Sequence, residues 1–361
     1  MTNHFYIHIP FCNQKCPYCK FALTPIFDEF KKRRYLEYLK KEIRTYFLNY
    51  THNNLDKTIY FGGGTPSILS HEEIREILES FPFYKNNQTE ITLESNPEDI
   101  SEKYVEGLIE LGINRLSMGI QTLNDQSLTE IHRSDKHSII QALEDLQKAI
   151  SKKGNISVNI DFIVGLPYTQ KGEILQAIQE IHKKYSYITH TSVYMLEDED
   201  YPKHWKENSI SEIDIQDEFT QILEYFEQVE WNHYELSNFA KPGFESIHNR
   251  GYWNHSNSRG FGLSSASFEN NIRWNNASSF TGYYEGKKEH EEILNPKSIE
   301  IEKMMFGLRT HGWQVDDNFL KDSSTKVSIL QEQNLIILEN NTIQLTKTGI
   351  FLIDYVLSEL L

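Results

Sequence analysis

Short apolar runs alternate with longer amphipathic stretches over the first half of the chain. The apolar runs predict strands, because they are short and rich in β-branched and aromatic residues. We expect strands at residues 5–9, 58–61, 90–95, 115–120, 157–164 and 190–196. The stretches between them have apolar residues at helical spacing, and they predict helices at residues 28–49, 71–80, 101–111, 136–152 and 172–184.

Local signals support the predicted helix ends. Ser70 and Glu73 have the spacing of a capping box, so we expect it to start the helix at 71–80. Gly112 follows the helix at 101–111, where glycine is a common C-terminal cap.

A succession of strand-then-helix units implies parallel strands joined by right-handed crossovers. The fold class is therefore α/β, and either a doubly wound sheet or a full or partial barrel satisfies the pattern. In barrels, chemistry lies at the C-terminal ends of the strands. Polar and glycine-rich residues follow the predicted strands at those ends, which predicts a functional rim there.

The pattern changes from about residue 236. Residues 236–290 are rich in Ser, Asn, Gly and aromatics, and we interpret them as an extended connection. Residues 291–361 predict helices at 298–311, 326–333 and 347–360 and a hairpin that turns at Asn340-Asn341. Helices followed by a small hairpin are typical of a winged-helix module. We therefore predict three parts, 1–235, 236–290 and 291–361.

Charge and composition narrow the function. The 361 residues have a net charge of −16, which disfavours a nucleic-acid-binding role, although a local basic patch is compatible with it. No run of about 18 apolar residues predicts a transmembrane helix, so any membrane contact would be peripheral. The first residues lack the pattern of a secretory signal. An odd cysteine count agrees with a cytoplasmic location.

The cysteines are the strongest chemical signal. Cys12, Cys16 and Cys19 are the only three in the chain, with C-x3-C-x2-C spacing. Thiolates favour zinc or an iron–sulfur cluster, and structural zinc needs four ligands. A four-iron cluster held by three thiolates would keep one iron open for another ligand. A zinc site completed by a distant histidine, and three thiols without a metal, are the alternatives.

The surrounding motifs point to a family. FYIHIPFCNQKCPYCKF, YFGGGTPSIL, NIDFIVGLP and HNRGYW resemble the radical S-adenosylmethionine (SAM) superfamily, and together they resemble the HemW family of haem chaperones. That family is similar to the oxygen-independent coproporphyrinogen III oxidases of porphyrin biosynthesis. The resemblance implies a partial (β/α)6 barrel with a C-terminal winged-helix-like domain. It also implies a [4Fe–4S] cluster, SAM and haem as cofactors.

The resemblance implies roles residue by residue. Cys12, Cys16 and Cys19 would hold the cluster, and His248 would ligate haem. The implied SAM contacts are Tyr6, Tyr18, Gly63, Gly64, Thr65, Glu94, Gln121, Arg133 and Asp161. The residues alone also allow structural roles. Glu94 could cap a turn, the glycines could form a tight turn, and His248 could only hydrogen-bond. No catalytic residue is assigned.

Two functions remain: a chaperone that hands haem to an acceptor protein, or a coproporphyrinogen III dehydrogenase. The oxidases resemble C-x3-C-x2-C-x-C, whereas Phe21 occupies that fourth cysteine position here, as in the chaperones. The H-N-x-x-Y motif at His248 also favours the chaperone. Lys20 and Ala266 depart from residues common in the family. The acceptor, the electron donor for the cluster and the oligomeric state are not readable from the sequence.

Overall fold

Six parallel strands form the centre of the computed structural model, which describes residues 1–20, 22–25, 28–48, 50, 56–86, 88–154, 156–196 and 201–361. They are β1 (His4–Ile9), β4 (Thr58–Gly63), β5 (Glu90–Ser95), β6 (Arg115–Gln121), β7 (Ser157–Val164) and β8 (Ile188–Met195). They lie side by side in this order, and they are parallel, as the sequence predicted. Phe21 lies outside the described residues.

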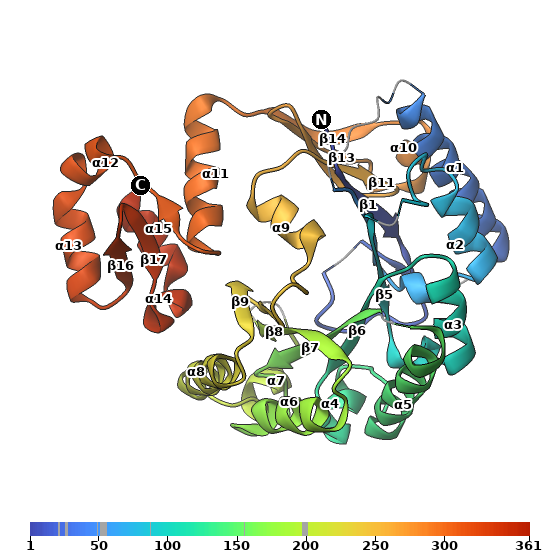
Figure 1. Ribbon diagram of the computed structural model, residues 1–361, viewed down its shortest axis with the longest axis horizontal. Helices are drawn as coiled ribbons and strands as arrows, with labels where there is room; N and C mark the ends of the chain where they lie inside the picture. The colour runs from blue at the N-terminus through green and yellow to red at the C-terminus, as the bar shows by residue number, and fades with distance from the viewer. Residues whose placement is uncertain are drawn as a thin grey trace.

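Helices follow the strands and cover the outer side of their arc (Figure 1). They are α1 (Glu29–Phe47), α2 (His71–Leu78), α3 (Glu102–Glu110), α4 (Asp125–Glu130), α5 (Lys136–Lys153), α6 (Glu173–Lys184), α7 (Lys203–Asn208) and α8 (Glu212–Gln228). The predicted capping box of Ser70 and Glu73 starts α2. This arrangement is the partial barrel that the family resemblance implied, and it decides against the doubly wound sheet that the residue pattern also allowed.

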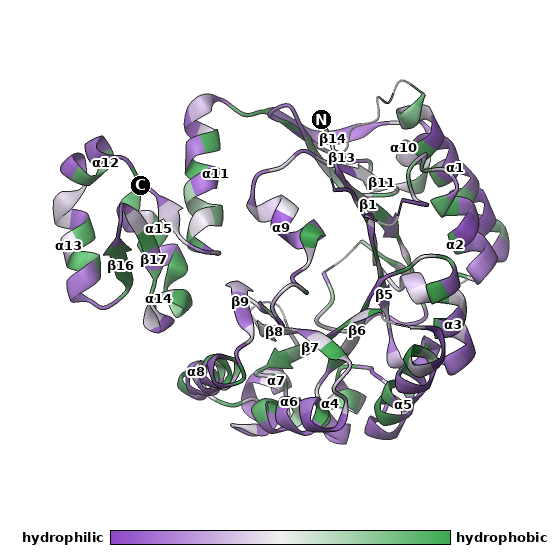
Figure 2. Ribbon diagram, in the orientation of Figure 1, coloured by the Kyte–Doolittle hydropathy of each residue, from purple (hydrophilic) through white to green (hydrophobic). Residues whose placement is uncertain are grey.

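The two faces of the sheet differ in chemistry because side chains alternate along a strand. Residues such as Phe5, Ile7 and Phe61 are fully buried against the outer helices. Their neighbours on the other face are polar, for example His8 and Asp161. Figure 2 shows apolar and polar segments along the outer helices, as expected for helices that bury one face. The concave side of the arc is therefore lined with polar groups.

Residues 236–290 are not an extended connection, which corrects the prediction. Strand β11 (Ser258–Phe261) pairs in parallel with β1, and β12 (Ala266–Glu269), β13 (Ile272–Asn276) and β14 (Lys288–Ile293) extend the sheet beyond it. At the other edge lie β10 (Asn238–Ala240) and β9 (Asn232–Glu235). The segment also contains α9 (Ile247–Trp253), inside the arc, and α10 (Phe280–Tyr284).

Short elements complete the loops that follow the strands. Strands β2 (Phe11–Cys12) and β3 (Thr24–Pro25) pair on either side of the cysteine loop. Single 3-10 turns, Pro66–Ile68 and Pro97–Asp99, follow β4 and β5.

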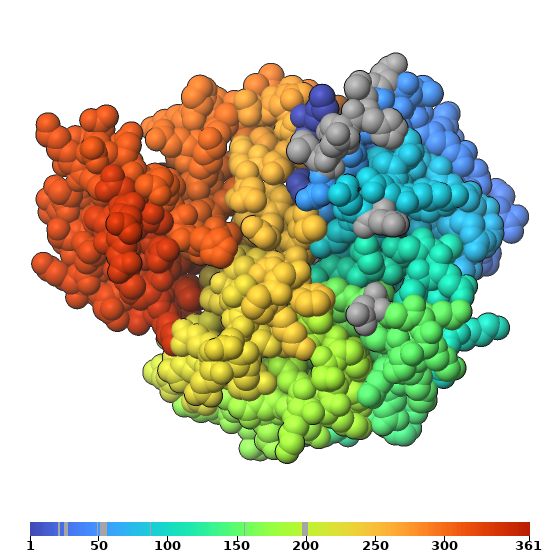
Figure 3. Space-filling view, viewed as in Figure 1, coloured from blue at the N-terminus to red at the C-terminus, as the bar shows by residue number. Residues whose placement is uncertain are grey.

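The last part of the chain forms a lobe beside the barrel (Figure 3). Its elements are α11 (Pro296–Leu308), β15 (Trp313–Gln314), α12 (Asp317–Asp322), α13 (Ser324–Glu332), β16 (Ile336–Glu339), β17 (Thr342–Leu345), α14 (Lys347–Phe351) and α15 (Ile353–Leu360). Leu330, Ile343 and Val356 are fully buried in a hydrophobic core separate from that of the barrel. The predicted last helix is interrupted at Leu352, whose backbone is not helical. Among the helices the structure describes, none is long and apolar enough to cross a membrane.

Candidate cofactor site

The cysteine loop begins directly after β1, at the C-terminal rim of the barrel. Cys12 and Cys16 are buried, Cys19 is partly buried, and none of them forms a disulfide. The Cys12 thiol lies 2.9 Å from the Gln14 carbonyl, and the Cys16 thiol lies 3.8 Å from the carbonyl of His132. As placed, the described side chains include no group of three His, Cys, Asp or Glu that could hold a metal ion. Cluster ligation by the cysteines therefore stays a prediction.

A chain of hydrogen bonds leads away from the loop and back to it. Thr65 Oγ1 donates to Cys12 Sγ over 3.1 Å, and Asn96 Nδ2 donates to Thr65 Oγ1 over 3.3 Å. Arg133 then donates from Nη1 to Asn96 Oδ1, and from Nε to the Tyr18 hydroxyl over 2.9 Å. Thr65, Tyr18 and Arg133 were predicted from the sequence, and the structure brings all three to the cysteine loop.

Gln121 is the last residue of β6 and lies beside this series of hydrogen bonds. Its backbone is left-handed, with φ of 66°, and its side chain is buried. The amide oxygen Oε1 has no hydrogen-bond partner among the described residues. A buried acceptor without a donor is costly, so a ligand that brings a donor to this position would be stabilised there. This orphaned atom fits a nucleoside cofactor, which carries amine and hydroxyl donors.

The glycine motif after β4 packs tightly against β1 and β2. Gly63 has a φ of 112°, and a Cβ atom there would lie 2.6 Å from the His8 ring. A Cβ atom on Gly64 would collide with the carbonyl oxygen of Phe11. The glycines are thus required by the close approach of their own chain, which is the tight-turn alternative left open by the sequence. Contact with SAM stays a prediction.

Glu94 lies in the polar interior next to this motif. Its carboxylate accepts from the Tyr60 hydroxyl over 2.8 Å and from the Gly63 amide over 3.2 Å. Burial raises the pKa of Glu94 to about 7; the Tyr60 hydrogen bond lowers it, and the charge of Asp161 raises it. Glu94 therefore changes charge near neutral pH. Tyr6, another predicted SAM contact, has its hydroxyl 3.2 Å from His8 Nδ1.

Asp161 lies between apolar residues of β7, and its carboxylate has hydrogen-bond partners in the protein. Ser117 Oγ donates to Oδ2 over 3.2 Å, and Asn159 Nδ2 donates to Oδ1 over 2.8 Å. Burial still raises the pKa of Asp161, because these neutral donors replace water only in part. His190 Nδ1 continues the network to Asn159 Oδ1 at 2.6 Å.

His248 lies at the opposite end of the barrel from the cysteines. It belongs to α9, and its Nδ1 is 2.6 Å from the hydroxyl of Thr58, the first residue of β4. Its Nε2 is 3.0 Å from the Tyr252 hydroxyl, and its ring stacks on Tyr60 with centroids 4.8 Å apart. Both ring nitrogens therefore already have hydrogen-bond partners. Burial holds the pKa of His248 well below its usual value, so the ring is neutral.

Glu90, the first residue of β5, fixes α9 to the same end. Its carboxylate accepts from the backbone amides of Ile247 and His248 over 3.0 and 2.9 Å. A strand of six residues spans about 20 Å, so the HNRGY motif and the cysteine loop lie at opposite mouths of the barrel.

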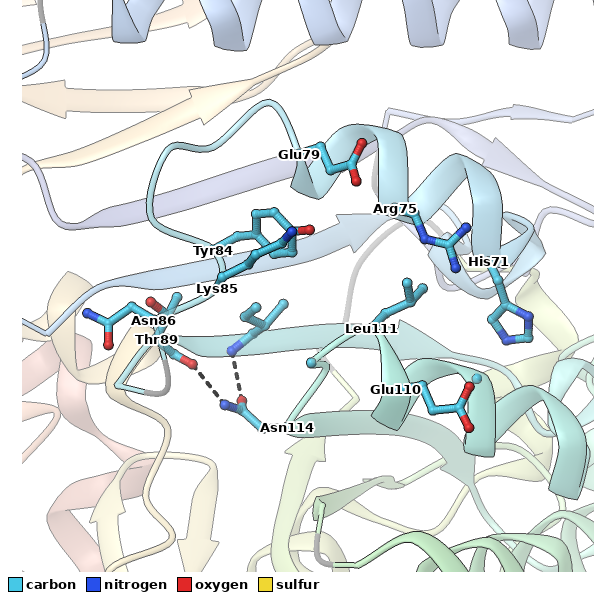
Figure 4. Close-up of a pocket in the computed structure, with 13 residues that line it drawn as sticks. His71, Arg75, Glu79, Tyr84, Lys85, Asn86, Thr89, Glu110, Leu111 and Asn114 are labelled. Carbon is cyan, nitrogen blue, oxygen red and sulfur yellow. Dashed lines mark hydrogen bonds between the residues drawn. The ribbon is translucent and has the colours of Figure 1, made fainter.

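A cavity on the outer surface lies away from both ends of this site. It has a volume of about 650 Å³ and lies between α2 and α3 on the outer surface (Figure 4). Asn114, at its base, holds the backbones of Ile91 and Thr89 by bonds of 2.8 Å each. No predicted site residue lines it.

Comparison with known proteins places this geometry in a family. The model of the radical SAM superfamily matches residues 6–181. Haem chaperone HemW of Lactococcus lactis is 30% identical over 85% of this chain and 81% of its own length. Haem chaperone HemW of Bacillus subtilis is 31% identical over 84% of this chain and 82% of its own. The chain belongs to the HemW family. The match to the radical SAM superfamily model implies a [4Fe–4S] cluster and SAM as cofactors.

A solved structure shares the fold. The coproporphyrinogen III oxidase HemN of Escherichia coli matches with a TM-score of 0.83 over 99% of this chain and 90% of that one. The two sequences are 19% identical, so this likeness concerns the fold alone. It extends through the C-terminal lobe, which accords with the fold predicted for HemW proteins.

Some residues of the site were not predicted. Asn96 joins Thr65 to Arg133, and Tyr60 joins His248 to Glu94. Asn96 follows β5 at the rim, so its position after a strand was a usable signal. Tyr60 gave none, because only the strand alternation in three dimensions shows that it faces inward. Ala266 is exposed on β12, which pairs with β11 beyond β1.

Proposed function

We propose that this protein is a haem chaperone that carries a SAM-liganded [4Fe–4S] cluster and passes haem to an acceptor protein. The observation that carries the proposal is identity of 30% and 31% to proteins named haem chaperone HemW, over more than four-fifths of each chain. The cytoplasm is the compartment we propose. The acceptor and an electron donor for the cluster are the partners that this function requires.

Cys12, Cys16 and Cys19 would hold the cluster at the C-terminal rim. SAM would bind beside it, against the sequence-predicted contacts, and Gln121 Oε1 would gain the donor that it lacks in the protein. The cluster, when bound, supplies one-electron chemistry, which belongs to the cofactor. The hydrogen-bond chain through Thr65, Asn96 and Arg133 would keep the loop in position.

His248 would ligate haem through its neutral ring. In the structure its Nε2 is hydrogen-bonded to the Tyr252 hydroxyl, so this hydroxyl must move away before the nitrogen can ligate haem. Tyr252 is 39% exposed at the end of α9, so it can be displaced without opening the apolar core.

Anaerobic reconstitution with iron and sulfide, followed by haem titration with and without SAM, tests the proposal. We expect about four irons per chain, stoichiometric haem binding and transfer of haem to a haem-free acceptor. Zinc in the loop, or no haem binding, contradicts it. Conversion of coproporphyrinogen III to protoporphyrinogen IX would instead support an oxidase.

The role of His248 is tested separately. A His248→Ala variant should lose the absorption spectrum of histidine-ligated haem while keeping its iron–sulfur content. An unchanged haem spectrum would remove His248 as a ligand and leave the chaperone function standing.

A further inference from the structure

A second cavity, of about 340 Å³, lies outside the barrel between α1 and the segment from α10 to β14. Tyr38 and Tyr46 of α1 line it together with Tyr283 and Tyr284 of α10. Its volume is in the range of small-molecule sites, and four of its twelve lining residues are tyrosines. Such walls suit a flat, apolar ligand.

The cavity is positively charged in a chain whose net charge is −16. Four cations line it, Lys41, Arg259, Lys287 and Lys288, against one carboxylate, Glu42. Glu42 already accepts from the Gly262 amide over 3.0 Å, and from Asn276 Nδ2 and the Tyr283 hydroxyl over 2.8 Å each. Lys287 and Lys288 also face Glu285 and Glu291 at the surface, at 2.7 and 3.8 Å.

Arg259 is the best-placed anion receptor in this cavity. Its guanidinium lies over the rings of Tyr46, Phe261 and Trp274, 5.2, 5.5 and 5.1 Å from their centroids. Its distance to Glu42 is 3.6 Å, and its buried Nε has no hydrogen-bond partner among the described residues. A buried donor without an acceptor destabilises the chain, and a carboxylate bound in the cavity would pair with the charge of the guanidinium.

We propose that this cavity binds the carboxylate edge of a planar tetrapyrrole, with the propionates on Arg259 and Lys288 and the ring against the tyrosines. The proposal rests on the proposed haem-chaperone function and adds a site to it. Arg259 pairs with Phe5, whose side chain faces the outer helices, whereas the adjacent His4 contacts His248 on the inner face. A tetrapyrrole in the cavity would therefore be separated from His248 by the sheet.

Titration of the full chain with iron-free protoporphyrin IX and with its dimethyl ester tests the proposal, because the ester lacks the carboxylates. We expect the ester, and the Arg259→Met and Lys288→Met variants, to bind at least about tenfold more weakly than the acid binds the unmodified chain. Asn208→Ala, an exposed position remote from the cavity, should bind the iron-free acid unchanged. Lys288 is 44% exposed, so its variant reports on binding even if Arg259→Met fails to fold.

The outcomes separate this proposal from the proposed function. If the unmodified chain binds haem but the acid and ester bind equally, or Lys288→Met binds the acid unchanged, the cavity is not a tetrapyrrole site and the chaperone function stands. If the unmodified chain binds neither haem nor the porphyrin, the chaperone function itself is overturned, and this proposal with it.

Discussion

Arg133 shows how single residues around the cysteine loop serve the fold and the site together. Its charge is buried, and it donates to Tyr18 and Asn96. Tyr18 lies within the loop and Asn96 directly follows β5, so the guanidinium ties the loop to the end of that strand. A residue that the sequence resemblance assigned to SAM is therefore also a structural tie for the ligands of the cluster.

A substitution at Asn96 is the best test of this hydrogen-bond series, because Asn96 joins Thr65 to Arg133. Asn96→Ala removes the acceptor of a buried Arg133 donor and the donor to Thr65, so we expect the free energy of unfolding to fall by about 1–3 kcal/mol. We also expect less iron per chain after anaerobic reconstitution, measured by iron analysis and absorbance. Asn208→Ala, which removes an exposed bond to His204, is the control and should keep full iron content. Full iron content in Asn96→Ala would show that the loop needs no such support.

Glu94 gives the stability a pH dependence whose sign follows from its burial. Its pKa is about 7 in the folded chain and 4.5 as its ordinary value, so the folded state holds a proton that the unfolded state releases between these values. The contribution of Glu94 to the free energy of unfolding is fully present below pH 4.5. It is lost as the pH rises through 7, by up to about 3 kcal/mol. Glu94→Gln should flatten this fall, measured by denaturant unfolding between pH 4.5 and 7.5.

Glu235, whose burial also raises its pKa to about 7, provides a matched variant for comparison. Glu235→Gln should flatten the profile to a similar extent without affecting SAM binding. If Glu94→Gln and the unmodified chain show parallel profiles, Glu94 is not protonated in the folded state.

At the scale of elements, local patterns predicted the six barrel strands β1, β4, β5, β6, β7 and β8 but not the strands at the edges of the sheet. The runs at 58–61 and 157–164 are apolar and β-branched, and strands form there. Strand β11 reads SRGF within a Gly- and Ser-rich stretch, which carries no such pattern. It becomes a strand because β1, more than 250 residues earlier, offers an unpaired edge. Strand pairing over that separation cannot be predicted from local sequence patterns.

Helix α9 places His248, and Glu90 anchors that helix. Glu90→Ala removes the acceptor of the first amides of α9, so we expect a loss of about 1–3 kcal/mol in stability and faster amide hydrogen exchange over residues 247–253. Ser211→Ala, which removes the side-chain cap of α8, should cost about 1 kcal/mol without faster exchange in α9. Unchanged exchange in α9 after Glu90→Ala would mean that side-chain packing alone holds the helix.

At the scale of the whole molecule, there are two separate hydrophobic cores, and polar and aromatic contacts join the parts that contain them. The backbone amide of Leu236 donates to the carbonyl of Arg309 over 2.9 Å, and Phe219 lies against Phe351 with ring centroids 5.9 Å apart. The predicted boundary at residue 291 falls inside β14, which still belongs to the barrel sheet. The sequence placed it too early because β14, KEHEEI, is charged and exposed and lacks a strand pattern. The separate core begins with α11.

This division predicts that the lobes lose structure independently. Leu330→Ala, in the C-terminal core, should cost about 2–5 kcal/mol and speed hydrogen exchange over residues 296–360 while the barrel keeps its protection. Leu146→Ala, an equally buried leucine in α5, should have the converse effect. Exchange that rises evenly over the whole chain in both variants would mean one cooperative unit. In that case the barrel and the C-terminal lobe would not move separately during haem transfer or cluster chemistry. The contacts at Leu236 and Phe351 would then help to hold the site in place.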